Sequence, residues 1–158
     1  AMRRQAGTDL AFKNGPGIRA GLFKGIIKMR DIYQVMPFEN TLVQLTMTGA
    51  RISELFRDNI TRGRCYLQVS GLSVKFHEGP DGKAAEIRLE KDGKEIKPED
   101  KFSVATNNYM TTGGSGGRAF NQFGELLDTM RSVRDALIKD LEDNYITDVR
   151  PGGRITIF

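Results

Sequence analysis

The chain has 158 residues, of which 39% are hydrophobic and 28% charged, so it is long enough for a sizeable core and has the composition of an ordinary globular protein. Its net charge of +4 mildly favours an anionic partner, but the basic residues form no stripe interleaved with aromatic ones, which argues against nucleic-acid binding. No apolar run approaches the roughly 20 residues that a membrane helix needs, and a single cysteine allows no intrachain disulfide.

The first forty residues combine short predicted elements with turns rich in glycine. Residues Met2–Ala6 look like the end of a helix stopped by Gly7, and we therefore expect the chain to be a piece of a longer protein. Pro37 disfavours helix in the residue before it and ends the next helical stretch. The elements expected are, in chain order, the helix end Met2–Ala6, a buried strand Asp9–Lys13, a turn Asn14–Gly17 and a helical turn Met29–Val35.

The middle of the chain alternates between strand and helix patterns. Apolar and polar residues alternate over Asn40–Met47 as in a strand, and Ala50–Ile60 has apolar residues at the spacing of one helix face. Residues Tyr66–Phe76 indicate a strand pair or one bulged strand, with Gly71 at the irregularity. The following expected elements are a hairpin loop Glu78–Lys83, a strand Ala85–Leu89, a tight turn at Asp92-Gly93 and a strand Phe102–Thr106.

The last third is expected to hold a loop, a long helix and a terminal strand. Residues Asn107–Arg118 form the loop, Phe120–Asn144 the mostly helical segment and Arg154–Phe158 the strand. An apolar stripe that should pack on the core comprises Leu126, Leu127, Met130, Val133, Leu137, Ile138 and Leu141. Strands interspersed with helices of uneven length predict an α+β fold with mixed sheets and flanking helices, and residues 1–158 are expected to form one domain.

Side chains for hydrolytic chemistry are scarce in this sequence. A nucleophilic Ser or Cys needs a base within reach, usually His, and the only histidine, His77, lies at a strand–hairpin margin where we expect it to be solvated. Cys65, in a strand-like stretch, is expected to be a buried, inert thiol. One histidine cannot supply the ligands of a two-metal phosphatase site, and one His with one Cys all but excludes a zinc site. We therefore expect no catalytic residue, no metal site and no hydrolysis by this chain alone.

Three glycine-containing loops are better candidates for ligand binding. In Asn14–Arg19 a glycine turn that lets backbone approach a ligand precedes an arginine that can fork onto phosphate; the alternative is a tight turn before a surface arginine. In Met36–Asn40 a phenylalanine on a proline-bent loop is either an exposed stacking ring or a core plug. In Asn108–Gly117 an aromatic residue before a glycine run can form one wall of a base-stacking slot; no Gly-Lys-Ser/Thr follows, so this is not a P-loop.

The order of these motifs resembles one protein family. Asn-Gly-x-Gly-Ile-Arg is followed by Pro-Phe-x-Asn, a strand with Thr-Gly, Leu-Gln-Val-Ser-Gly-Leu, and Ala-Thr-Asn-x-aromatic before a Gly-Gly loop. Over about Met2 to Phe158 this pattern is similar to the C-terminal domain of the 5′-nucleotidases, a family that includes bacterial UDP-sugar hydrolases, 2′,3′-cyclic-nucleotide phosphodiesterases and ecto-5′-nucleotidase. The resemblance implies the layered fold of that C-terminal domain.

The resemblance also implies a division of labour. An N-terminal metallophosphatase domain, outside this chain, holds a divalent metal pair and the catalytic residues, and the C-terminal domain binds the nucleoside or nucleotide and rotates to carry it there. The base stacks between two rings that fall on Phe38 and Tyr109, an arrangement worth about 1–3 kcal/mol per base and tolerant of base identity. Contacts to base, sugar and phosphate fall on Asn14, Gly17, Arg19 and Asn40. The family is mostly periplasmic, cell-wall or extracellular.

Two positions depart from the family pattern. The family usually has Gly-Gly-Asp in the third loop, with the carboxylate accepting hydrogen bonds from the ribose hydroxyls, whereas this chain has Ser115, which would bond a ribose less strongly. Tyr109 stands where Phe is commoner. Two alternatives to nucleotide recognition stay open: the substrate-binding domain of a relative acting on cyclic nucleotides, nucleotide sugars or thiosulfate-derived groups, and a non-catalytic adhesion or scaffold module that keeps the fold.

Overall fold

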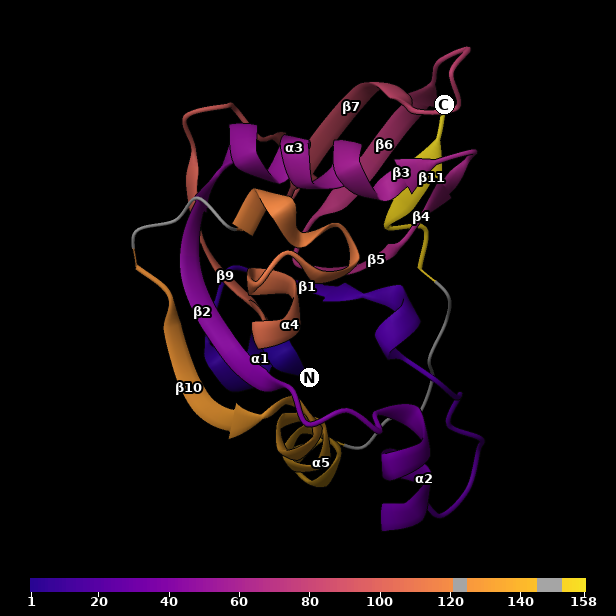
Figure 1. The fold of residues 1–158 in the computed structure, drawn as a ribbon, viewed down its shortest axis with the longest axis vertical. Helices are drawn as coiled ribbons and strands as arrows, with labels where there is room; N and C mark the ends of the chain where they lie inside the picture. Colours follow the sequence, from indigo (N-terminus) through magenta and orange to yellow (C-terminus); the bar gives the residue numbers. More distant parts are fainter. Residues whose placement is uncertain (121–124, 145–151) are drawn as a thin grey trace.

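A computed structural model describes residues 1–120, 125–144 and 152–158 of the protein (Figure 1). Its largest element is a five-stranded sheet with the strand order β10-β2-β9-β1-β5, in which β1 and β9 run parallel and the other neighbours antiparallel. Its strands are β1 Leu10–Asn14, β2 Thr41–Thr48, β5 Leu67–Ser70, β9 Lys101–Asn107 and β10 Leu127–Ser132.

A second sheet of four strands has the order β11-β6-β7-β8, with β11 parallel to β6. Its strands are β6 Ser73–Glu78, β7 Ala84–Lys91, β8 Lys94–Glu95 and β11 Ile155–Ile157, and a small ribbon pairs β3 Ile60–Thr61 with β4 Arg64–Cys65. The helices are α1 Met2–Ala6, α2 Met29–Val35, α3 Gly49–Asn59, α4 Asn108–Thr111 and α5 Val133–Asp143, and the 3₁₀ segments are η1 Gly15–Gly17 and η2 Gly114–Phe120.

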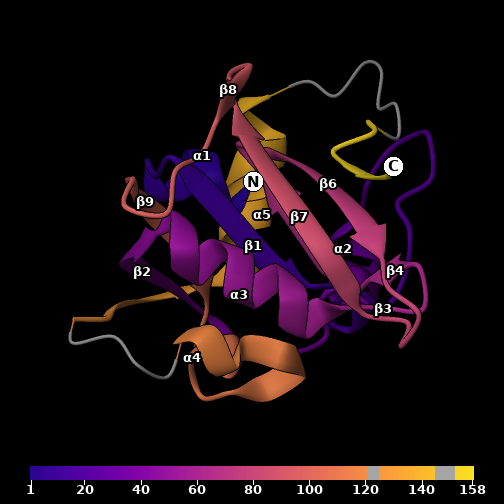
Figure 2. The same cartoon turned by 90° about the horizontal axis from the view of Figure 1, so that it is seen from above.

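The core is divided between the two faces of the five-stranded sheet. On one face α3 packs between the two sheets, where Phe12 of β1 meets Phe56 of α3 edge to face at 5.8 Å between ring centroids. On the other face Ala11 of β1 packs with Val133 and Ala136 of α5. Strand β1 is therefore buried on both sides, with α3 and α5 on opposite faces of it (Figure 2).

Most of the elements predicted from the sequence are confirmed. The fold is α+β with mixed sheets, and Thr48 caps α3 because its hydroxyl oxygen accepts a hydrogen bond from the Arg51 amide. The segment Tyr66–Phe76 forms two strands, not one bulged strand, because Gly71 takes a left-handed φ of 97° and sends β5 and β6 into different sheets. The Asp92-Gly93 turn joins β7 to β8 with positive φ at both residues.

The single histidine matches its expectation fully and the single cysteine only in part. His77 is exposed, as expected. Cys65 is half-buried where full burial was expected, and desolvation raises the pKa of its thiol, which keeps it protonated and unreactive at neutral pH.

The predicted helix over Phe120–Asn144 is wrong in its first half. Residues Leu127–Ser132 form strand β10, which pairs with the edge of β2, and α5 begins only at Val133; residues 121–124 lie outside the described part of the chain. Leu126, Leu127 and Met130 are therefore exposed and not part of a core stripe. The open edge of β2 supplied hydrogen-bonding partners that the local apolar spacing did not reveal.

The predicted loop Asn107–Arg118 is also more ordered than expected. Asn107 ends β9, and its side chain caps the short helix α4 by accepting a hydrogen bond from the Met110 amide at 2.9 Å. The glycine run that follows forms η2 around two left-handed residues, Ser115 and Gly116. This folding brings the third candidate loop back beside the first.

Candidate functional site

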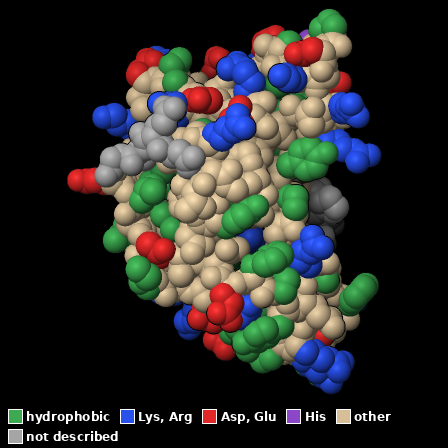
Figure 3. All heavy atoms as spheres, in the orientation of Figure 1, with side chains coloured by type: hydrophobic (Ala, Val, Ile, Leu, Met, Phe, Trp, Pro, Cys, Tyr) green, Lys and Arg blue, Asp and Glu red, His purple; other side chains and the backbone are tan. Residues whose placement is uncertain are grey.

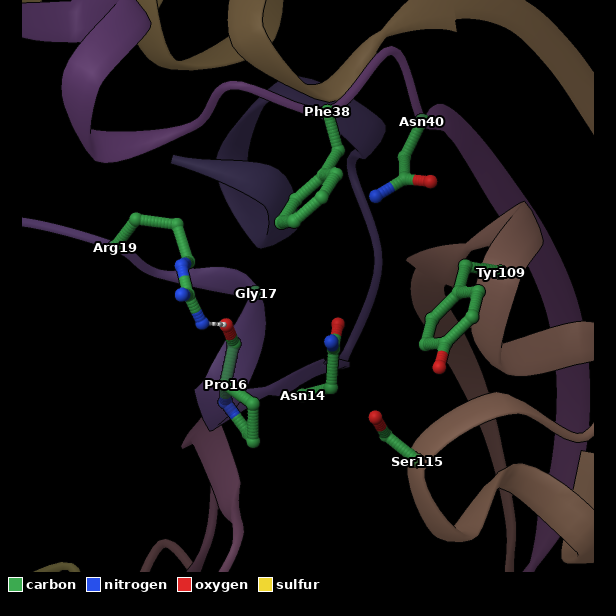
Figure 4. Close-up of a pocket in the computed structure, with 8 residues that line it drawn as sticks. All are labelled: Asn14, Pro16, Gly17, Arg19, Phe38, Asn40, Tyr109 and Ser115. Carbon is green, nitrogen blue, oxygen red and sulfur yellow. Dashed lines mark hydrogen bonds between the residues drawn. The ribbon is translucent and has the colours of Figure 1, made fainter.

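A cavity of ≈ 280 Å³ opens at the edge of the five-stranded sheet where the three candidate loops meet (Figure 4). The loops meet because β1 and β9 are parallel and end at this edge, while the antiparallel β2 begins there. The residues that line the cavity are Asn14, Pro16, Gly17, Arg19, Phe38, Asn40, Tyr109 and Ser115. All seven residues predicted to bind substrate are thus brought together, and Pro16 joins them; that they contact a ligand stays a prediction.

Two half-exposed aromatic rings stand on opposite sides of this cavity. Phe38 is 50% exposed on the loop between α2 and β2, so it is not the core plug that the sequence left as an alternative. Tyr109 is 46% exposed at the start of α4. Both rings point into the space between the loops, with the side chain of Asn40 directed toward the same space (Figure 4). The arrangement leaves a space between two aromatic rings, called the slot below, and such a lining suits a flat, planar group.

The loop that carries Phe38 is hydrogen-bonded to Arg134 of α5. The guanidinium donates from Nε to the carbonyl of Met36 at 3.0 Å, and from Nη2 to the carbonyls of Pro37 at 3.2 Å and Phe38 at 3.4 Å. It also lies 4.0 Å from the ring centroid of Tyr33 in α2. One buried cation therefore fixes three consecutive carbonyls of the loop that carries the ring.

The Tyr109 side of the slot is fixed by close packing of the glycine run. A Cβ on Gly114 would lie within 2.6 Å of the Tyr109 ring carbons, so glycine at this position lets the ring keep its place. The buried Asn59 at the end of α3 donates to the carbonyl of Gly116 at 2.9 Å and ties the run to the core. Ser115 between them has φ 46°, a left-handed conformation uncommon for a residue other than glycine, and its hydroxyl faces the cavity (Figure 4).

The floor of the slot is a small polar network around Asn14. Its side-chain oxygen accepts hydrogen bonds from Nδ2 of Asn107 at 3.1 Å and from Nζ of Lys13 at 3.5 Å. Lys13 is only 6% exposed and forms no ion pair with a described carboxylate, and desolvation lowers the pKa of its ammonium group. Gly17 covers the network, because a Cβ there would lie 2.7 Å from the Asn14 amide nitrogen.

Arg19 supplies an exposed positive charge at the mouth of the cavity. Its backbone amide donates to the carbonyl of Val35 at 2.9 Å, which anchors the turn, and its Nη1 donates to the carbonyl of Pro16 at 3.2 Å. The guanidinium keeps further donors for an anionic group. On the face of the molecule drawn in Figure 3, acidic and basic side chains are intermixed and lie mainly toward the outer edge of the view.

Sequence reasoning missed four buried polar residues that support the slot: Lys13, Asn59, Asn107 and Arg134. Asn59 had a readable signal, because it continues the apolar face formed by Ile52, Leu55 and Phe56 and a polar residue there needs a partner. Arg134 had none, because its partners are backbone carbonyls about one hundred residues away.

Within residues 1–120, 125–144 and 152–158, no three His, Cys, Asp or Glu side chains are grouped as metal ligands. None of the helices in this part of the chain has the length and apolar character for crossing a bilayer.

The chain is similar in sequence to one protein family and to several larger proteins. Residues 1–125 match the family model described as 5′-nucleotidase, C-terminal domain. The chain is 34% identical over 129 residues to the trifunctional nucleotide phosphoesterase protein YfkN of Bacillus subtilis, covering 76% of this chain and 9% of that protein. It is 30% identical over 166 aligned residues to the cell wall protein Lmo0130 of Listeria monocytogenes, covering 98% of this chain and 20% of that protein.

The fold has close counterparts among solved structures. The structure of a 5′-nucleotidase precursor from Thermus thermophilus aligns with a TM-score of 0.85 at 29% identity, covering 98% of this chain and 32% of that one. The chain therefore spans only about a third of that protein's length, and less of the two relatives named above. All three are larger proteins of which this chain corresponds to one part.

Proposed function

Because this chain belongs to the 5′-nucleotidase C-terminal domain family, we propose that it is the substrate-recognising part of a larger metal-dependent phosphohydrolase and binds a nucleoside or nucleotide in its cavity. The observation that supports this most directly is the slot between Phe38 and Tyr109, two half-exposed rings from loops about seventy residues apart that point into one cavity. A purine or pyrimidine would stack between them, and this stacking would contribute about 1–3 kcal/mol per base to the binding free energy.

The polar residues around the slot suit the other parts of a nucleotide. Asn14 and Asn40 offer amide groups beside the rings, and Ser115 offers a hydroxyl to a sugar. Arg19 at the mouth offers a fork of donors to a phosphate, a charge-assisted contact that is stronger than one between neutral groups. Base, sugar and phosphate would thus meet donors and acceptors of matching kind along one path from floor to mouth.

The chemistry of hydrolysis is proposed to lie outside this chain. An N-terminal metallophosphatase domain of the same parent polypeptide would supply a divalent metal pair, which activates water and stabilises charge on phosphorus. The residues of this chain would bind and orient the substrate for that domain. One relative is named a cell wall protein, and we propose a cell-wall, periplasmic or otherwise extracellular location for the parent.

The test is an NMR titration of the 158-residue chain with adenosine and with adenosine 5′-monophosphate at millimolar concentration. Phe38→Ala and Tyr109→Ala should each weaken adenosine binding by about tenfold or more, the equivalent of about 1.4 kcal/mol. Tyr109→Phe is the matched control and should retain binding, since it keeps the ring. Unchanged affinity in both alanine variants would remove the stacking slot from the proposal.

A second candidate arises from Ser115. Without the family's usual carboxylate at this position, the slot would hold a ribose diol less firmly, which favours substrates without a free diol, such as cyclic nucleotides or thiosulfate-derived groups. Nucleotide sugars, which keep the diol, are the other alternative within the family. Titration with adenosine 2′,3′-cyclic monophosphate, UDP-glucose and thiosulfate beside adenosine 5′-monophosphate separates these candidates by the ligand bound most tightly. A chain that binds none of them would instead fit the non-catalytic scaffold alternative.

A further inference from the structure

Arg134 is the most unusual buried charge near the slot. It is 7% exposed, yet no described carboxylate pairs with it; its charge is met by three carbonyl dipoles and the face of Tyr33. A buried cation with such partners is costly unless its geometry is held, and here all its partners belong to α2 and the loop that follows it. The guanidinium therefore joins α5 to the segment that presents Phe38.

We propose that Arg134 is a positioning residue for the ligand slot, which fixes the Phe38 ring by fixing the backbone beneath it. The inference rests on the proposed function, because this role exists only if Phe38 contacts the ligand. Arg134 is not among the residues that line the cavity, so it would act through Phe38 and not by touching the ligand.

The loop depends on Arg134 because it has few other internal constraints. Pro37 has no amide hydrogen to donate, and the hydrogen bonds found for the carbonyls of Met36, Pro37 and Phe38 within the described residues all come from Arg134. A planar guanidinium can reach several carbonyls with separate donors, whereas a lysine ammonium is one point charge on a flexible stem. The residue type therefore matches this geometry.

The helix that carries Arg134 is anchored to α1 as well as to the loop, to which its first residue, Val133, also donates from its amide to the carbonyl of Asn40 at 2.9 Å. The Arg134 amide donates to the Ser132 hydroxyl oxygen at 3.1 Å at the start of α5, and further along the same helix Asp140 accepts from Nε of Arg4 at 2.7 Å. The loop is thus fixed to a firmly attached element, which is the arrangement that holds a binding side chain in place. A ligand that stacks on a ring already held in place loses less loop and rotamer entropy on binding.

The test is a double-mutant cycle between Arg134 and Phe38, with adenosine as the probe and the full 158-residue chain as the protein. Arg134→Met should raise the adenosine Kd by about three- to tenfold in the otherwise wild-type chain, because the ring is no longer held. In the Phe38→Ala background the same substitution should change the Kd by less than about 1.5-fold, because the ring through which Arg134 acts is gone. The upfield ring-current shifts of the adenosine H2 and H8 signals at saturation should shrink in Arg134→Met.

The matched control is Arg4→Met, which loosens α5 at its other end without touching the loop. It should lower the melting temperature while leaving the adenosine Kd and the ring-current shifts unchanged. Arg134→Lys should fall between wild type and Arg134→Met, and it replaces Arg134→Met in the cycle if that variant does not fold.

The outcomes separate the two proposals. An unchanged Kd in both Phe38→Ala and Tyr109→Ala would remove the stacking slot from the proposed function. A weakened Phe38→Ala combined with an Arg134→Met effect that is absent, or equal in both backgrounds, would overturn the positioning role alone. Equal weakening by Arg4→Met would likewise overturn it, because general loosening of α5 would then explain the result.

Discussion

Gly114 shows how tightly the slot is built at the scale of single residues. A methyl group at this position would overlap the Tyr109 ring, so Gly114→Ala should push the ring out of its place and raise the adenosine Kd by about tenfold. The same NMR titration checks this. Gly21→Ala is the control, because a Cβ there meets nothing within 4 Å. If Gly114→Ala bound adenosine with the wild-type Kd, displacement of the Tyr109 ring would not impair binding.

Ser115 offers a test of where a sugar would lie. Ser115→Asp introduces a carboxylate at a left-handed position, which Asp tolerates better than most residues. We expect adenosine to bind about tenfold more tightly, because a hydrogen bond to a charged acceptor is worth about 1.5–3 kcal/mol. The affinity for 2′,3′-dideoxyadenosine should not improve, since it lacks the 2′ and 3′ hydroxyls that would donate to the carboxylate. A gain shared by both ligands would argue against a ribose at this position.

Lys13 should destabilise the fold at neutral pH. Burial lowers the pKa of its ammonium group, so the folded chain releases this proton more readily than the unfolded chain. The free energy of unfolding should therefore rise with pH between the lowered pKa and the ordinary value near 10.5. Lys13→Met should stabilise the chain by about 1 kcal/mol at pH 7, with less gain near pH 10, as measured by urea unfolding. Lys101→Met, at an exposed position, should change little.

At the scale of elements, the sequence specified α3 far better than it specified β10. The helix has its own cap at Thr48 and its own apolar face, so local information was sufficient. Strand β10 exists because β2 has an open edge, and Asp128 adds a side-chain contact by accepting a hydrogen bond from the Thr41 hydroxyl at 2.7 Å. Both partners lie more than eighty residues away, so no local spacing could predict the strand.

The contact between α1 and α5 should make stability depend on pH in the acid range. A hydrogen bond from Arg4 lowers the pKa of Asp140 below its ordinary value near 3.8. The stabilisation is therefore present above that value and is lost as pH falls through the lowered pKa. Asp140→Asn should cost about 1–2 kcal/mol at pH 7 in urea unfolding. The difference from wild type should shrink as pH falls below 3.8 and through the lowered pKa; a difference that does not shrink there would show that the charge is not its cause.

At the scale of the whole molecule, the slot exists only when the sheet is formed. Its residues come from segments near positions 14–19, 36–40 and 109–115, which the strand order β2-β9-β1 brings to one edge. The sequence resemblance named all seven predicted residues of the cavity, because the motifs carry their own order along the chain. It could not name Arg134 or Lys13, whose roles depend on what the folded backbone places around them.

A ligand that needs all three loops should stabilise the entire fold. Adenosine at ten times its Kd should raise the free energy of unfolding by about 1.4 kcal/mol and the melting temperature by about 3 °C. Thermal melts over a series of adenosine concentrations check this. Phe38→Ala, with a Kd about ten times higher, should gain only about 0.4 kcal/mol and about 1 °C at the same concentration. A stabilisation as large as that of the wild-type chain would place the binding site elsewhere.

The parallel pairing of β1 with β9 has a consequence for how such a domain can diversify. It puts the ends of two central strands and the start of a third at one rim, while the buried faces of those strands point into the two cores. Loop substitutions or insertions at the rim can therefore reshape what is recognised without repacking the interior. Ser115 lies in one of these loops, and libraries randomised in all three would test whether other ligands can be bound on an unchanged framework.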